Sequence, residues 1–265
     1  MSGAGNLFSV IEGDKLTAMR DKSTLAKILC NIESGIKTEG LLIVNKSHQH
    51  DFEVDFYNPD GSHSMMCGNG GRCAVRFSID HDIVTQKDLY EFSMASSVYK
   101  ALAGNNIKLF FPEPKKILDN LKIEENPKIS GRYIDNGSDH FVILSDMFNT
   151  ALYNIDIMKI APALRFSKTF EPHGANINFY ELDEFARIKL RTYERGVEAE
   201  TGACGTGALA TAISAYLDDQ VSFPVEVIPT SGIPLVVNAE YSENHFTGLS
   251  LEGPAEYIGL NQIEI

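Results

Sequence analysis

The apolar residues of this chain fall into many short runs separated by polar turns, a pattern typical of β-strands. In the first half we expect strands at 7–11, 40–44, 52–56, 89–94, 98–102 and 107–111. In the second half we expect strands at 133–135, 141–144, 176–180, 187–193, 225–228, 235–239 and 249–251. The chain therefore reads as strand-rich α/β.

Apolar residues spaced three or four apart interrupt the strands at four places and predict helices there. The first helix is expected within 16–32, on the spacing of Leu16, Met19, Leu25, Ile28, Leu29 and Ile32. The second is expected through 73–79, the third around 155–164 and the fourth through 205–217. Pro162 leaves the end of the third helix open, because proline cannot donate a backbone hydrogen bond.

Two halves are suggested by length and by one repeated motif. A chain of 265 residues can form one large domain or two of about 130 residues. The segment 112–116, Pro-Glu-Pro-Lys-Lys, interrupts the periodicity and makes the best domain boundary. On either side of it, Cys-Gly-x-Gly occurs once, at 67–70 and at 204–207, each time leading into a helix-like segment. A duplicated scaffold would carry one cysteine turn in each half.

Composition narrows the classes of partner. The formal charge is 23 − 36 = −13, and the chain has no basic run of five or more residues, so a nucleic-acid surface is not expected. Hydrophobic and charged contents of 43% and 22% are typical of a soluble globular protein. An anionic substrate would have to be held by local groups, since the global field is negative.

The chain has four cysteines, Cys30, Cys67, Cys73 and Cys204. Residues 1–8 lack the features of a signal peptide, and no stretch approaches the roughly 20 apolar residues of a membrane span. We therefore expect a cytoplasmic protein with free thiols. Cys30 and Cys73 lie on helical apolar faces and are expected in the core. A zinc site at Cys67 and Cys73 lacks further ligands of suitable spacing.

A glycine-rich turn that enters a helix presents unpaired backbone N–H groups and a partial positive charge, which suits an anion. The same field favours a thiolate at the cysteine that opens the turn. Two such turns could grip one carboxylate and stabilise the negative charge that develops when the neighbouring carbon loses its proton. One thiolate as base and one thiol as acid make a two-base inversion that requires no metal and no pyridoxal phosphate.

Other interpretations have to be kept beside this one. A single free cysteine is most often a small buried hydrophobe, so one motif alone would favour a packing role. Two matched motifs instead favour a catalytic role for both cysteines. A different class of protein stays open, a non-catalytic redox or binding protein in which Cys67 and Cys204 form a disulfide.

Several segments resemble the diaminopimelate epimerase family. They are Asn-Pro-Asp-Gly-Ser at 58–62 with Met-Cys-Gly-Asn-Gly-Gly-Arg-Cys at 66–73, and Tyr-Glu-Arg-Gly at 193–196 with Glu-Thr-Gly-Ala-Cys-Gly-Thr-Gly at 200–207. Segments 3–8 and 174–179 are also similar to the family. The matches span almost the whole chain in the expected order.

The resemblance implies two similar α/β lobes, each a strand-rich, barrel-like sheet around a central helix, with the active site in the cleft between them. The N-terminal lobe would comprise 1–112 together with about 253–265 and would carry Cys67. The C-terminal lobe would comprise 113–252 and would carry Cys204.

The resemblance also implies a cofactor-independent isomerase that converts L,L- to meso-2,6-diaminopimelate in lysine and peptidoglycan biosynthesis. Its catalytic residues would be Cys67 and Cys204. Backbone amides would hold the carboxylate at the reacting carbon, and polar side chains would hold the rest of the amino acid. The amides are those of Gly68, Asn69, Gly205 and Thr206, and the side chains are Asn6, Asn58, Asn176, Glu194 and Arg195, with His140 and Ser138 as accessory positions.

The physical chemistry of these side chains agrees with those roles. Arg195 can grip a distal carboxylate with two hydrogen bonds, and Glu194 can take an ammonium. Simpler roles stay open: a solvated ion pair for Glu194 and Arg195, a turn former for Asn58, and a structural histidine at His140. The expected partner is a small amino acid, with no nucleic acid, membrane, metal or cofactor, and a homodimer stays open.

Two departures from the family concern the substrate's distal end. The family commonly has Gly-Asn-Pro-His where this chain has Gly-Ser-Asp-His at 137–140, and the loop 195–200 is one residue longer than in familiar members. A racemase of another amino acid on the same fold is therefore the nearest rival. Proline racemases, however, prefer histidine at the position of Asn69 and lack Tyr-Glu-Arg-Gly, and phenazine-type isomerases lack the cysteine pair.

Overall fold

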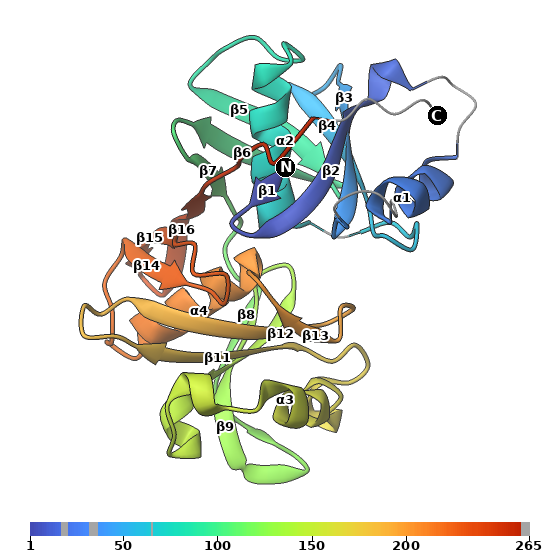
Figure 1. Ribbon diagram of the computed structural model, residues 1–265. Coiled ribbons are helices and arrows are strands. Elements are labelled where there is room, and N and C mark those ends of the chain that lie inside the picture. Colours follow the sequence, from blue (N-terminus) through green and yellow to red (C-terminus); the bar gives the residue numbers. More distant parts are fainter. Residues whose placement is uncertain (17–20, 32–36, 65, 261–265) are drawn as a thin grey trace. The chain divides into compact units, whose positions relative to one another are not determined.

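The computed structural model describes residues 1–16, 21–31, 37–64 and 66–260. The chain forms two compact units (Figure 1). The first comprises Met1–Phe110 and the segment from Glu252 onward, and the second comprises Phe111–Leu251. The division at 110/111 lies two residues before the one expected at 112/113.

In the first unit, seven strands among the described residues follow one another in sequence order. They are β1 (Ser2–Gly3), β2 (Asn6–Glu12), β3 (Gly40–Lys46), β4 (Phe52–Tyr57), β5 (Leu89–Met94), β6 (Ser97–Ala103) and β7 (Ile107–Phe110). The pairs β2–β3 and β4–β5 are parallel, and the other pairs are antiparallel. The helices are η1 (Gly13–Lys15), α1 (Lys22–Cys30) and α2 (Gly68–Asp80).

Helix α2 is the centre of the first unit. It packs against β1, β2, β3, β6 and β7, and its residues from Gly68 to Val75 are all buried. Small residues allow this close packing, since a Cβ added at Gly71 would lie 3.0 Å from Leu109 Cδ1. The sheet thus covers a central helix, as the resemblance implied.

The second unit repeats this order. Its strands are β8 (Lys116–Ile123), β9 (Asn126–Asp135), β10 (Asp139–Leu144), β11 (Asn176–Leu182), β12 (Ile188–Glu194), β13 (Ala199–Thr201), β14 (Val225–Ile228), β15 (Leu235–Ser242) and β16 (His245–Gly253), the last two residues of which belong to the first unit. Its helices are η2 (Ser145–Phe148), η3 (Leu152–Asn154), α3 (Ile157–Arg165), η4 (Lys168–Phe170) and α4 (Gly205–Leu217).

The two units share one topology. Strands β10, β11, β12, β14 and β15 pair parallel, antiparallel, parallel and antiparallel, as β2 to β6 do in the first unit. Helix α4 packs against β9, β10, β11, β12, β14 and β15, so it takes the place of α2. The prediction of two similar strand-rich units with central helices is confirmed.

The first predicted helix is shorter than the apolar spacing indicated. Helix α1 begins at Lys22 because the Asp21 side chain accepts hydrogen bonds from the backbone N–H groups of Ser23 and Thr24. Leu16 instead follows η1, and Met19 and Ile32 lie outside the described residues. Helix α3 continues past Pro162 to Arg165, since its buried face, including Ala161 and Leu164, packs on β11 and β12.

The hairpin of β8 and β9 was largely missed by the sequence pattern, which indicated only 133–135. Strand β8 lies at the end of the strand order, and most of its side chains are exposed or half-buried. An edge hairpin of this kind needs no regular alternation of apolar residues. Among the described residues, no helix combines the length and apolar character that crossing a membrane requires.

Candidate active site

Cys67 occupies the N-cap of α2, in extended backbone with φ −118° and ψ 116°. Its Sγ accepts a hydrogen bond from the backbone N–H of Gly70 at 3.5 Å. The sulfur thus takes the part that a serine or aspartate oxygen usually plays at a helix start. The side chain is half-buried, whereas Cys30 and Cys73 are 0% exposed, as predicted for core residues.

Cys204 occupies the N-cap of α4 with almost the same backbone, φ −112° and ψ 109°. It is 7% exposed, and its Sγ lies 3.7 Å from Thr206 Oγ1. A Cβ added at Gly207 would lie 3.2 Å from Cys204 Sγ and 2.5 Å from Asn178 Oδ1, so only glycine fits there. None of the four cysteines, all of which lie in the described part of the chain, forms a disulfide bond.

A chain of buried polar groups supports the first cysteine turn. Arg72 Nη2 donates to Asn69 Oδ1 at 2.7 Å, and Asn69 Nδ2 donates to Asn6 Oδ1 at 2.6 Å. Asn6 Nδ2 in turn donates to Glu39 Oε2. Burial raises the pKa of Glu39. The structure therefore brings together two predicted site residues, Asn6 and Asn69, and adds Arg72 and Glu39, which the motif had not singled out for the site.

Asn58 follows β4 and begins a tight turn. Its backbone N–H donates to Ser62 O at 2.9 Å, its carbonyl accepts from Gly61 N at 2.9 Å, and its Nδ2 donates to Ser62 Oγ at 3.0 Å. Asn58 therefore has the turn-forming contacts of the simpler interpretation.

In the second unit, several predicted residues gather where β10 and β11 begin and β12 ends. Asn176 Nδ2 donates to Ser138 Oγ and to Asp139 O, each at 2.9 Å. Asn176 Oδ1 accepts the backbone N–H of Arg195 at 2.8 Å. The register explains this meeting, because His140 pairs with Asn176 in the parallel ladder.

The Arg195 side chain forms an ion pair with Asp139, one of the two residues that depart from the family. Arg195 Nη1 lies 2.6 Å from Asp139 Oδ2 and donates to Gly174 O at 3.1 Å. Tyr133 Oη donates to Asp139 Oδ1 at 2.5 Å. Burial alone would raise the pKa of Asp139, but the hydrogen bonds from Tyr133 and Arg195 and the positive charge lower it below its usual value.

The loop after β12 is held from within the unit. Thr201 Oγ1 donates to Glu194 Oε1, and Glu198 N donates to Glu194 O at 2.9 Å. Glu198, in the lengthened loop, accepts from Gly196 N at 3.0 Å and pairs with the buried Arg165 at 3.1 Å. These contacts fix the backbone that carries Glu194 and Arg195.

His140 is 0% exposed and pairs with Asn178. Asn178 Nδ2 lies 3.1 Å from His140 Nδ1, and an amide nitrogen can only donate, so Nδ1 is the acceptor and the ring proton is on Nε2. Burial lowers the pKa of His140 to about 3, and the ring is therefore neutral at physiological pH. Asn178 Oδ1 accepts from Thr192 at 3.1 Å. The pair lies beneath the first turn of α4, where Gly207 approaches Asn178.

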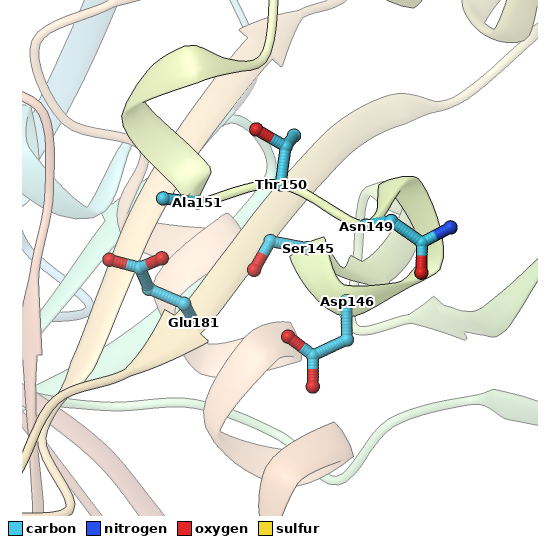
Figure 2. A pocket seen from close by; sticks show the side chains of 6 residues that line it. All are labelled: Ser145, Asp146, Asn149, Thr150, Ala151 and Glu181. Carbon is cyan, nitrogen blue, oxygen red and sulfur yellow. The ribbon is translucent and has the colours of Figure 1, made fainter.

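A hollow of about 480 Å³ lies elsewhere in the second unit. Figure 2 shows its lining residues: Ser145, Asp146, Asn149, Thr150, Ala151 and Glu181. Glu181 is already engaged, since it accepts the N–H of Leu152 at 2.8 Å and lies 3.7 Å from Lys189. None of the predicted site residues lines this hollow.

Known proteins are similar to this chain over almost its whole length. The family model described as diaminopimelate epimerase matches residues 1–95 and 132–258. A diaminopimelate epimerase of Aquifex aeolicus is 35% identical over 257 residues, which cover 92% of this chain and 89% of the relative. One of Flavobacterium psychrophilum is 32% identical over 256 residues, covering 97% and 95%.

Two solved structures match in fold. A Bacillus anthracis phenazine biosynthesis protein of the PhzF family has a TM-score of 0.70 at 13% identity, covering 100% of this chain and 95% of its own. A probable proline racemase from Agrobacterium radiobacter has a TM-score of 0.68 at 13% identity, covering 92% and 81%. The sequence matches are the more specific, and by them the chain belongs to the diaminopimelate epimerase family.

Proposed function

We propose that this protein is a diaminopimelate epimerase, which converts L,L- to meso-2,6-diaminopimelate without pyridoxal phosphate. The observation that supports this proposal best is that Cys67 and Cys204 have nearly the same N-cap backbone at the start of two glycine-rich central helices. Family membership and the relatives' names support the substrate. We further infer a cytoplasmic enzyme of lysine and peptidoglycan biosynthesis.

The proposed reaction uses the two thiols in turn. A cysteine thiolate removes the proton from the α-carbon, and the electron pair of that C–H bond moves into the adjacent carboxylate. The thiol of the other cysteine then gives its proton to the opposite face of the same carbon, which inverts the centre and leaves the second sulfur as thiolate. Atoms and charge balance, because one thiolate and one thiol exchange their states in each turnover.

The backbone amides of Gly68, Asn69, Gly205 and Thr206 are proposed to hold the reacting carboxylate. All four lie in the first turn of α2 or α4, where N–H groups lack intrahelical acceptors. Negative charge grows on this carboxylate as the proton leaves, so the donors bind the transition state more strongly than the substrate.

The remaining polar residues are proposed to hold the rest of the amino acid. Nη1 of Arg195 is engaged by Asp139 and Gly174, and no bond to its Nε or Nη2 is found among the described residues. That edge of the guanidinium is suited to a distal carboxylate. Glu194 is proposed to take the distal ammonium, with Asn6, Asn58 and Asn176 as further contacts. His140 and Ser138 would support these contacts.

Asp139 changes the electrostatics of this end, because the Asp139–Arg195 pair is neutral overall. Carboxylate binding would then depend on directed hydrogen bonds more than on net charge. A racemase of an amino acid without a second carboxylate would have little use for this open guanidinium edge.

Proton NMR of L,L-diaminopimelate with the reduced protein in D2O tests the proposal. We expect loss of the Cα–H signal and appearance of the meso isomer, and neither change with Cys67→Ser. If the folded, reduced protein with free thiols gives no exchange, diaminopimelate is not its substrate, and a panel of other amino acids would identify the alternative.

A further inference from the structure

Arg72 is a fully buried cation, and its hydrogen-bond acceptors among the described residues are all uncharged. Its Nη2 donates to Asn69 Oδ1 at 2.7 Å, its Nε to Pro254 O at 3.3 Å and its Nη1 to Gly68 O at 3.4 Å. The side chain is 0% exposed, and no carboxylate within the described ranges lies at ion-pair distance from it. Burial lowers the pKa of Arg72 to about 10, so the guanidinium stays charged at neutral pH.

The position of this charge is unusual for a helix. Helical side chains point toward the N-terminus, and Arg72 accordingly reaches back to Gly68 and Asn69, the residues that follow Cys67. The N-terminal end of a helix already carries a partial positive charge, so a buried cation there is unfavourable unless an anion lies close by. A thiolate at Cys67 would supply that anion.

Few other charged groups face this turn. The Met1 ammonium is half-buried and donates to Phe8 O at 2.7 Å, and Glu39 is reached only through Asn6. Burial raises the pKa of Cys73 to about 12, which keeps that thiol neutral. The remaining charged side chains on the strands that pack against α2 are exposed or paired at the surface: Glu12, Lys46, Lys100 and Lys108.

We propose that Arg72 is a positioning residue that stabilises the thiolate of Cys67 and orients the Asn69 amide beside it. The proposal rests on the proposed function in that Cys67 serves there as a base. Arg72 itself does not contact substrate in this account.

The test is the pH dependence of Cys67 alkylation by iodoacetamide, measured by peptide mass spectrometry in a Cys204→Ser background. Cys30 and Cys73 are buried and serve as internal controls. Arg72→Gln keeps an amide donor for Asn69 but removes the charge, whereas Arg72→Lys keeps the charge. We expect Arg72→Gln to raise the pH midpoint of alkylation by about one unit or more, and Arg72→Lys to stay near the parent.

If Arg72 had a purely structural role, the pH midpoint of Cys67 alkylation would shift equally in Arg72→Gln and Arg72→Lys or would shift in neither. Either result overturns the proposal. Should Arg72→Gln fail to fold, the thiolate absorbance near 240 nm of the unsubstituted chain decides instead. A larger loss of signal at pH 7.5 in Cys67→Ser than in Cys204→Ser supports the proposal, because α4 has the same N-cap backbone but Leu209 at the position of Arg72; equal losses, or no signal, overturn it. Neither readout requires turnover, so a protein with an activated Cys67 that does not act on diaminopimelate would refute the function and leave this inference standing.

Discussion

The two cysteine turns have the same backbone but differ in their side chains at two matched positions. In the first unit the side chain nearest to Gly70 is apolar, since Leu42 is the nearest neighbour of a Cβ added there. In the second unit the corresponding neighbour of Gly207 is the amide of Asn178. On the helices the polar residue belongs to the first unit instead. The fifth residue after the cysteine is Arg72 in α2 and Leu209 in α4.

This difference shows how a duplicated scaffold can keep one geometry and still make two unlike thiols. A turn that places a cysteine at a helix N-cap depends on backbone and glycine, and both units preserve it. The charge around the sulfur depends on side chains further along the helix and on the sheet, and those differ. We therefore expect Cys67 to be the resting thiolate and Cys204 the resting thiol.

The largest expected effect comes from removing either thiol. Cys67→Ser and Cys204→Ser should each lower kcat by about 10³-fold or more, because a hydroxyl is far less acidic than a thiol and cannot replace either proton carrier. Steady-state epimerisation with circular dichroism as the control for folding measures this. Near-normal turnover of either variant would contradict a mechanism that needs both units.

The next effect concerns the polar cluster around Arg195 in the second unit. Arg195→Ala should raise KM and lower kcat together, by about 10²-fold in kcat/KM, through loss of a charged hydrogen-bonding group. Asp139→Asn is the matched control, since it keeps an acceptor for Arg195 and should change kcat/KM only a few-fold. An unchanged kcat/KM in Arg195→Ala would show that this side chain does not touch substrate.

The two equivalent glycines provide a smaller and more direct test of the comparison. Gly207→Ala forces a methyl group within 2.5 Å of Asn178 Oδ1 and should destabilise the protein by about 1–3 kcal/mol. Gly70→Ala meets only ordinary contact, 3.4 Å from Leu42 Cδ2, and should be neutral or slightly stabilising. Urea unfolding of both variants measures the difference, and equal losses would mean that the two turns are packed alike.

The smallest effect expected is in acid sensitivity, and it belongs to the second unit. Burial holds the pKa of His140 at about 3, below the unfolded value near 6.5, so the unfolded chain takes up the proton first as pH falls. The stability that depends on neutral His140 is complete above pH 6.5 and is lost progressively toward pH 3. From pH 7 to 5.5 this amounts to about 1 kcal/mol.

His140→Gln should remove this part of the pH dependence while keeping an acceptor for Asn178. Urea midpoints of both proteins at pH 7 and 5.5 give the comparison. If the urea midpoint falls equally in the two proteins between pH 7 and 5.5, His140 is not the group that makes stability depend on pH.

Much of this architecture could be predicted from the sequence, because strands and glycine turns are encoded locally. Runs such as Gly40–Lys46 and Leu89–Met94 fall where the apolar pattern indicates. The edge strand Lys116–Ile123 does not, since its exposed faces need no alternation. The ion pair of Asp139 with Arg195 joins residues 56 apart in sequence, and the pair of His140 with Asn178 joins residues 38 apart. Such pairs follow from strand register, which local patterns leave open.

The measurement that tests the two-thiol account most directly is the position of deuterium at early times. L,L-diaminopimelate would be converted in D2O to only a few per cent, and product and recovered substrate would be analysed separately by mass spectrometry. The account predicts deuterium in the meso product and almost none in the recovered L,L substrate, because one sulfur removes the proton and a different, solvent-exchanged sulfur supplies the new one. Deuterium in both isomers at equal early rates would indicate a single base and would contradict it.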